Sequence, residues 1–123
     1  MEGLDFAKQR LNEMLDVLNK AGESFDVANL KAELEELNRS MEAPGFWDNI
    51  EEAQKVNKRA KNLENRIQRF ENLYRAVDEN LQLWEMADDE GDEDTKAEVG
   101  AEVGELARRV EELRLSTMLK GEY

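Results

Sequence analysis

Apolar residues spaced alternately three and four positions apart run without a break through residues 50–84. They are Ile50, Ala53, Val56, Ala60, Leu63, Ile67, Phe70, Tyr74, Val77, Leu81 and Trp84. Because this spacing keeps side chains on one face of a helix, the pattern predicts a single long helix over residues 48–87 with a continuous apolar seam. Such a helix is about 60 Å long. Phe70 lies in the middle of the seam and is expected to face the last helix of the chain.

The beginning of this helix is marked by a break and a cap. Pro44 and Gly45 interrupt the preceding apolar pattern. Asp48 is placed to accept a hydrogen bond from the backbone N–H of Glu51, whose side chain can reach back in a capping box. The long helix is therefore expected to begin directly after Asp48.

Three shorter apolar stripes predict three further helices. They cover residues 5–20, 26–42 and 93–119. Gly22 is expected to terminate the first of them, Asp26 to cap the second, and Gly91 to form the turn before the fourth. The buried side of the fourth helix is expected to carry Val99, Val103, Leu106, Val110 and Leu113. No segment has the alternating pattern of a strand, so residues 1–123 are predicted to form one all-α domain.

Helix length then limits how these elements can pack. The fourth helix spans only about 38 Å, so it cannot cover the whole long helix. The turn at residues 88–92 is short, and the fourth helix is expected to fold back antiparallel on the C-terminal half of the long one. The first two helices remain to cover the end at residues 50–60. The predicted architecture is an elongated antiparallel helical bundle or coiled coil with one very long helix, in which the orientation of the first helix stays open.

Several residues along these helices have both a structural and a functional interpretation. Phe46 and Trp47 either form a knob that binds a partner or plug the end of the bundle, and the plug is the more common use of aromatic residues beside a helix start. Trp84 continues the seam and is expected in the core. Gly100 and Gly104 lie one turn apart, which favours a close approach by another helix.

The composition excludes several kinds of chemistry. The chain contains neither Cys nor His, so disulfides, thiolate nucleophiles, zinc sites and imidazole acid–base catalysis are all ruled out. A di-iron bundle requires Glu-x-x-His pairs and is excluded by the same absence. An enzyme would have to use carboxylates, Lys or Tyr alone. We therefore assign no catalytic, cofactor-binding or metal-binding residue and expect no cofactor.

Charge points toward protein partners. The chain has 30 acidic and 17 basic residues and a net charge of -13. Direct readout of nucleic acid is not expected, because affinity for a phosphate backbone comes mainly from Lys and Arg. Arg108, Arg109 and Arg114 form a basic group, but acidic residues lie at helical neighbour spacing and favour local pairing. No apolar run reaches the roughly 20 residues of a membrane span and no signal peptide is present, so we expect a cytoplasmic protein.

The acids are concentrated between residues 88 and 102. That stretch holds eight acidic residues against Lys96 alone. A calcium loop needs oxygen ligands at alternate positions, and Asp92 and Asp94 are followed by Lys96, which breaks the series. A solvated turn with acids at a helix N-terminus is the preferred interpretation.

Two motifs go beyond a generic helical module. One is the run Ala43-Pro44-Gly45-Phe46-Trp47-Asp48, followed by Ala53-Gln54, Leu63 and Ile67. The other is the closing stretch from Leu113 through Met118-Leu119-Lys120 to Gly121-Glu122-Tyr123. Together they resemble the N-terminal domain of the bacterial peptide chain release factor 2 family, class-I factors that read UGA and UAA. The resemblance covers nearly the whole chain.

The resemblance carries expectations about function. In that family a tripeptide in the second domain reads the stop codon, and a Gly-Gly-Gln motif in the third promotes peptidyl-tRNA hydrolysis. This chain contains neither, so it is expected to be a non-enzymatic N-terminal fragment of a larger release factor. The family implies a position on the ribosome near the stalk base, contact with a ribosomal protein there, and an influence on the class-II recycling release factor. A free-standing cytoplasmic coiled-coil adaptor or chaperone-like interaction module remains the alternative.

Overall fold

The computed structural model describes residues 2–120, and within them every regular element is helical. The elements are α1 (Glu2–Phe25), α2 (Val27–Glu42), the short 3-10 helix η1 (Phe46–Asp48), α3 (Ile50–Glu90) and α4 (Glu93–Lys120). The predicted all-α class is confirmed, and α3 is the very long helix that the apolar seam indicated.

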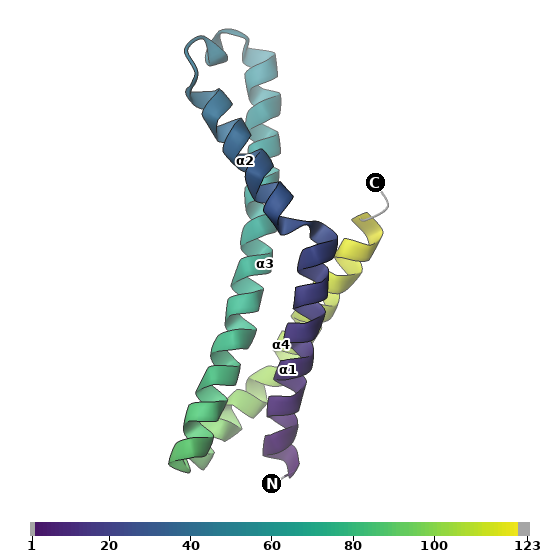
Figure 1. Ribbon diagram of the computed structural model, residues 1–123, viewed down its shortest axis with the longest axis vertical. Helices are drawn as coiled ribbons and strands as arrows, with labels where there is room; N and C mark the ends of the chain where they lie inside the picture. Colours follow the sequence, from purple (N-terminus) through teal and green to yellow (C-terminus); the bar gives the residue numbers. More distant parts are fainter. Residues whose placement is uncertain (1, 121–123) are drawn as a thin grey trace.

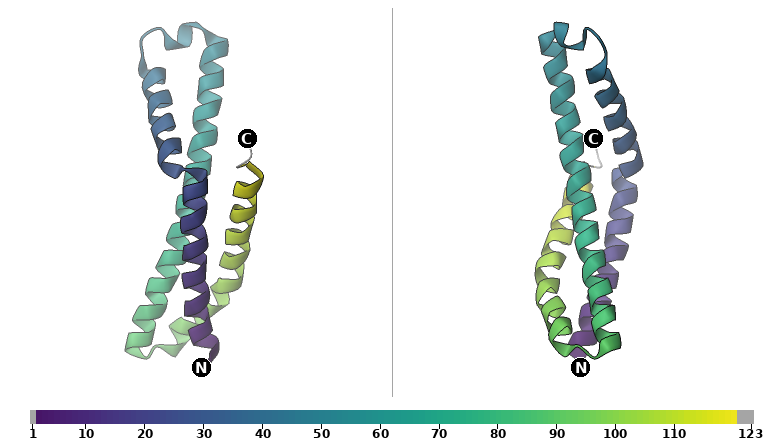
Figure 2. Two further views of the ribbon diagram at one scale, coloured as in Figure 1. Left: turned by 45° about the vertical axis from the view of Figure 1, so that its right-hand side comes forward. Right: turned by 90° about the vertical axis from the view of Figure 1, so that its left-hand side faces the viewer.

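The molecule is a rod with two different halves (Figure 1). In the lower half α1, α4 and the C-terminal half of α3 form a three-helix unit, called the bundle below. In the upper half α2 lies antiparallel to the N-terminal half of α3, and these two helices form a hairpin called the arm. Both views in Figure 2 show that α3 runs through the bundle and the arm without interruption.

Packing of α4 against the C-terminal half of α3 agrees with the sequence prediction, whereas the place of α1 does not. We expected α1 to help α2 cover the end of α3 around residues 50–60. Instead α1 packs along α4 and the lower half of α3. Packing α1 against both α3 and α4 is favourable because three helices can enclose a core. Each helix then buries a wide apolar stripe against two neighbours.

The bundle core combines apolar side chains from all three helices. It is formed by Ala7, Leu11, Met14, Leu18, Leu73, Val77, Leu81, Trp84, Val99, Val103, Leu106, Val110 and Leu113. Leu73 was not assigned to the predicted seam, yet it is buried. A helix that contacts two partners needs a wider apolar stripe than a two-helix seam, and Leu73 supplies the extra width.

Two helix boundaries differ from the prediction. Helix α1 does not stop near Lys20 but continues through Gly22 to Phe25. Helix α3 is capped by Asn49, whose side chain accepts a hydrogen bond from the backbone N–H of Glu52 at 3.2 Å. The expected cap, one residue earlier, is part of η1 instead. A 3-10 turn after Gly45 absorbs the aromatic residues and shifts the cap by one position.

The other predicted ends are observed. Asp26 caps α2 and accepts a hydrogen bond from the backbone N–H of Asn29. Gly91 ends α3 with φ 70°, a left-handed conformation that glycine adopts without steric cost. Helix α4 begins after Asp92, and Glu93 and Asp94 occupy its first turn, where acids interact favourably with the helix dipole.

Gly100 and Gly104 do not serve the close helix approach that their spacing suggested. A Cβ atom added at either position would meet no atom within 4 Å. Replacing each glycine with alanine should therefore stabilise the protein by about 0.5–1 kcal/mol, because alanine restricts the unfolded chain and creates no clash. Urea unfolding followed by circular dichroism at 222 nm measures the gain. A loss of stability at both positions would show that another surface packs against these glycines.

Candidate functional site

The arm is a two-helix hairpin in which only α3 has fully buried residues. The buried residues of α3 in this half are Ala53, Ala60, Leu63 and Ile67, and α2 has none. The apolar side chains of α2 that face them are half-buried, and they are Val27, Leu30, Leu34, Leu37 and Met41. The outer faces of both helices are therefore open to solvent or to a partner.

Two ion pairs join the helices of the arm. Arg59 donates from Nε and Nη2 to the two carboxylate oxygens of Glu33, at 2.9 and 3.1 Å. Lys31 Nζ lies 2.5 Å from Glu71 Oε2. The hydrogen bonds between Arg59 and Glu33 hold the pKa of Glu33 below its ordinary value and raise the pKa of Arg59 above its ordinary value. Since these side chains are 40–47% exposed, the pair contributes at most about 1 kcal/mol, and the contribution is lost as pH falls through the lowered pKa of Glu33.

The tip of the arm exposes aromatic and aliphatic surface. Phe46 and Trp47 pack edge to face with ring centroids 5.0 Å apart. Trp47 is 53% exposed and Ile50 is 63% exposed. The prediction that both aromatic residues plug the end of a bundle is therefore wrong for Trp47. Only two helices meet at the tip, so no third helix covers the ring.

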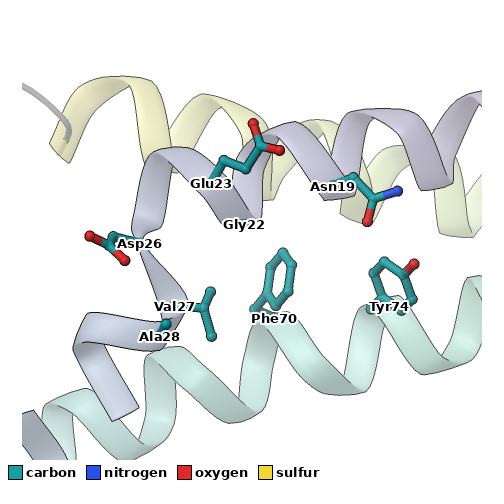
Figure 3. Close-up of a pocket in the computed structure, with 8 residues that line it drawn as sticks. All are labelled: Asn19, Gly22, Glu23, Asp26, Val27, Ala28, Phe70 and Tyr74. Carbon is teal, nitrogen blue, oxygen red and sulfur yellow. The ribbon is translucent and has the colours of Figure 1, made fainter. Parts of the chain in front are cut away.

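A pocket of about 830 Å³ lies where the arm joins the bundle. It is lined by Asn19, Gly22, Glu23, Asp26, Val27, Ala28, Phe70 and Tyr74. In Figure 3 the rings of Phe70 and Tyr74 rise from α3 toward α1, with Val27 beside Phe70. This junction pocket contains the one non-glycine residue with a positive φ angle among residues 2–120, Asp26 at 51°. Asp26 adopts the left-handed conformation that aspartate tolerates, and this allows the chain to turn from α1 directly into α2.

Phe70 lines the junction pocket and contacts the C-terminal part of α1 at Gly22. Its Cζ atom would lie 2.8 Å from a Cβ atom at Gly22, so any other residue there would force the ring or α1 to shift. The ring of Tyr74 lies 6.2 Å from that of Phe70, centroid to centroid. The expectation that Phe70 faces the last helix is thus corrected, because the ring packs against the end of α1. The glycine in a helical pattern was the sequence signal for this contact, and it was misread as a helix end.

At the foot of the bundle a buried cation contacts the core. Lys96 is 6% exposed, and its Nζ atom lies 2.6 Å from Asp88 Oδ1 and 4.9 Å from the ring centroid of Trp84. Lys8 Nζ lies 5.4 Å from the centroid of the same ring. Two cations therefore flank Trp84, and both gain from the negative face of the indole. The acidic stretch is not a purely solvated turn, since Asp88 pairs with this buried lysine.

The rest of the acidic stretch has a structural role too. Asp92 accepts hydrogen bonds from the backbone N–H and the hydroxyl of Thr95, at 3.0 and 2.6 Å, and these bonds lower its pKa. No group of three or more acidic side chains among residues 2–120 is arranged to hold a metal ion. On α4 Arg108 pairs with Glu105 and Glu112. The expected local pairing is confirmed for this arginine.

The described residues therefore offer surfaces for contact. Sequence reasoning gave a partner-binding knob at Phe46 and Trp47 only as the less common alternative to a plug, and it missed the junction pocket, because that pocket depends on where α1 ends. Within residues 2–120 no helix is both long and apolar enough to cross a membrane.

Comparison with known proteins identifies the family. The PCRF domain model matches residues 30–123. The chain is 36% identical over 114 residues to "Peptide chain release factor 2" of Clostridium perfringens (strain SM101 / Type A), a match that covers 93% of this chain and 31% of the relative. It is 36% identical over 99 residues to the protein of the same name from Acidothermus cellulolyticus, covering 80% of this chain and 27% of the relative.

A third relative matches along the whole chain. The "Peptide chain release factor 2" of Salinispora arenicola is 31% identical over 123 residues, which is 100% of this chain and 33% of the relative. The chain thus spans about a third of the length of the curated relatives that it matches. With a domain model that matches most of its length, the chain belongs to the PCRF domain family of peptide chain release factors.

Proposed function

We propose that the chain is the N-terminal helical domain of a cytoplasmic translation release factor. In this proposal it positions the factor on the ribosome near the stalk base, through a ribosomal protein, during stop-codon-dependent termination. It also influences the class-II recycling factor that removes the release factor afterwards. The chemistry of peptide release lies in other parts of the factor.

One observation carries the proposal. The chain matches 93% of its own length but only 31% of the length of a release factor. The shape is consistent with a positioning role, since an arm with an exposed aromatic tip extends away from a well-packed bundle (Figure 2). The net charge of -13 favours protein contacts over contacts with ribosomal RNA. The adaptor or chaperone-like alternative lacks any comparable support.

The test separates one round of release from many rounds. The isolated chain should release no peptide from ribosomes at any stop codon. A full-length factor that lacks residues 1–110 of this chain should keep appreciable single-round hydrolysis and lose speed over multiple rounds with the recycling factor present. The reason is that removal of a bound factor, and not the chemistry, would then limit turnover.

The matched control is the same pair of assays without the recycling factor, where the difference in multiple-round rate between the two factors should shrink. If the deletion abolished single-round hydrolysis while the remaining body stayed folded, the domain would belong to the catalytic assembly. The proposed positioning role would then be wrong.

A further inference from the structure

Three pockets that share lining residues lie next to one another along α3, beginning at the junction pocket. The junction pocket shares Phe70 and Tyr74 with a second pocket of about 450 Å³, and this one shares Glu71 with a third of about 300 Å³ between α2 and α3. The three together are called the junction groove below. Its apolar lining comes from Val27, Ala28, Leu34, Ile67, Phe70 and Tyr74. It follows α3 for about 15 residues, or roughly 20 Å.

Acidic side chains dominate the charged lining of this groove. They are Glu23, Asp26, Glu35, Glu64, Glu71 and Asp78, against Lys31 and Arg75. Lys31 is already paired with Glu71. Among the ion pairs of the described side chains, the pair of Lys31 with Glu71 is the one that involves an acid of the groove.

The outer face of α4 is different. There Arg108 and Arg114 form ion pairs with acids one turn away on the same helix. The acids of the junction groove thus keep a local negative field beside half-buried apolar side chains. Close to low-dielectric walls such a field is stronger than on an open face.

We propose that the junction groove is a docking site for a Lys- or Arg-rich segment of a partner protein. The segment places an apolar side chain beside Phe70 while its cations face the acids of the groove, above all Glu35, Glu64 and Asp78. Apolar burial supplies affinity, and opposite charge supplies orientation and a fast encounter.

The negative charge of the groove disfavours two other possible occupants, nucleic acid and a second copy of this chain. Nucleic acid would bring phosphates to a surface that already carries excess negative charge. A second copy of this chain has a net charge of -13 and would place acids against acids. A groove of about 20 Å fits roughly four turns of a helix, so a short cationic segment is the matching size.

The experiment uses the whole chain and a synthetic peptide of 14 residues made of Lys and Leu with one Trp. Fluorescence anisotropy of the labelled peptide measures binding to the unmodified chain and to a groove variant, Glu35→Lys, Glu64→Lys and Asp78→Lys. The matched control carries the same change in net charge outside the groove, Glu85→Lys, Glu98→Lys and Glu102→Lys. We expect the groove variant to bind at least about tenfold more weakly and the control to change by no more than about twofold.

A second measurement keeps the test valid if the groove variant folds poorly. Backbone N–H chemical shifts of the unmodified chain, followed while peptide is added, should change in residues 19–38 and 64–78. A peptide with Leu and Trp replaced by Ser should bind more weakly than the parent peptide. Circular dichroism of each variant checks its helix content.

Three results would overturn the proposal. Equal weakening in the groove variant and the control would mean attraction to bulk charge alone. Shift changes centred on Trp47 and Ile50 would place the contact at the arm tip. Unchanged affinity of the Ser-substituted peptide would remove the apolar anchor. The measurement contains no ribosome, so its failure leaves the proposed role in termination standing, and the release assays test that role separately.

Discussion

Replacing Trp84 with alanine is expected to lower the free energy of unfolding by about 3–5 kcal/mol. The indole is 2% exposed and lies in the bundle core among side chains from α1, α3 and α4. Its removal leaves a cavity and also takes the aromatic face away from the Lys8 and Lys96 ammonium groups. Single domains are stable by only about 5–15 kcal/mol, so a loss of this size is a large part of the total. Urea unfolding followed by circular dichroism at 222 nm measures it.

Two further variants show which property of Trp84 matters. The indole Nε1 has no hydrogen-bond partner among residues 2–120, so Trp84→Phe loses no hydrogen bond there and should cost much less than alanine. Trp47→Ala removes the same side chain at the exposed arm tip and should change stability by no more than about 0.5 kcal/mol. Equal losses at Trp84 and Trp47 would contradict the burial that distinguishes the two positions.

Replacing Gly22 with valine is expected to destabilise the protein by about 1–3 kcal/mol, even though valine has the higher helix propensity. A single Cβ atom at this position would already lie 2.8 Å from the Cζ atom of Phe70. The two methyl groups of valine leave the ring less space still, so either the ring or α1 must move. Urea unfolding of the variant, read out by helix content, gives the cost.

A double-mutant cycle assigns this cost to the Phe70 ring. With Phe70→Ala already in place, Gly22→Val should cost less than half as much, because the clashing atoms are gone. Gly100→Val is the matched control, since a Cβ atom at Gly100 meets nothing within 4 Å, and it should be nearly neutral. If Phe70→Ala did not reduce the cost of Gly22→Val, the clash would not be its cause.

Local signals in the sequence identified α3 and several helix ends, although the cap of α3 is Asn49 and not Asp48. The apolar spacing from Ala53 to Trp84 identified α3, and Asp26 and Gly91 marked helix ends, because each of these signals depends on nearby residues alone. The fourth helix and its antiparallel return followed from a short turn and a limited length. These features do not require knowledge of what lies across the core.

Features that depend on a third helix could not be predicted in this way. Leu73 is buried because α3 contacts both α1 and α4, and a two-helix seam gave no reason to include it. Gly22 lies inside α1, and its missing side chain leaves space for the ring of Phe70, 48 residues away. Lys96 is buried because it forms an ion pair with Asp88 and packs over the ring of Trp84. From the sequence alone, a charged residue is expected at the surface. The junction groove follows from these same distant contacts, which explains why sequence reasoning found no partner site there.

The uninterrupted course of α3 restricts how the length of this chain can change. An inserted residue near the junction would turn the arm by about 100° about the helix axis relative to the bundle, since a helix has 3.6 residues per turn. Seven inserted residues would restore the facing direction to within about 20° and lengthen the arm by about 10 Å, provided that α2 gained the same number. Because α3 is shared, the arm and the bundle keep one fixed rotation relative to each other about the axis of this helix. The arm can therefore change its length by whole heptads, whereas insertions of other lengths would rotate it away from its present orientation relative to the bundle.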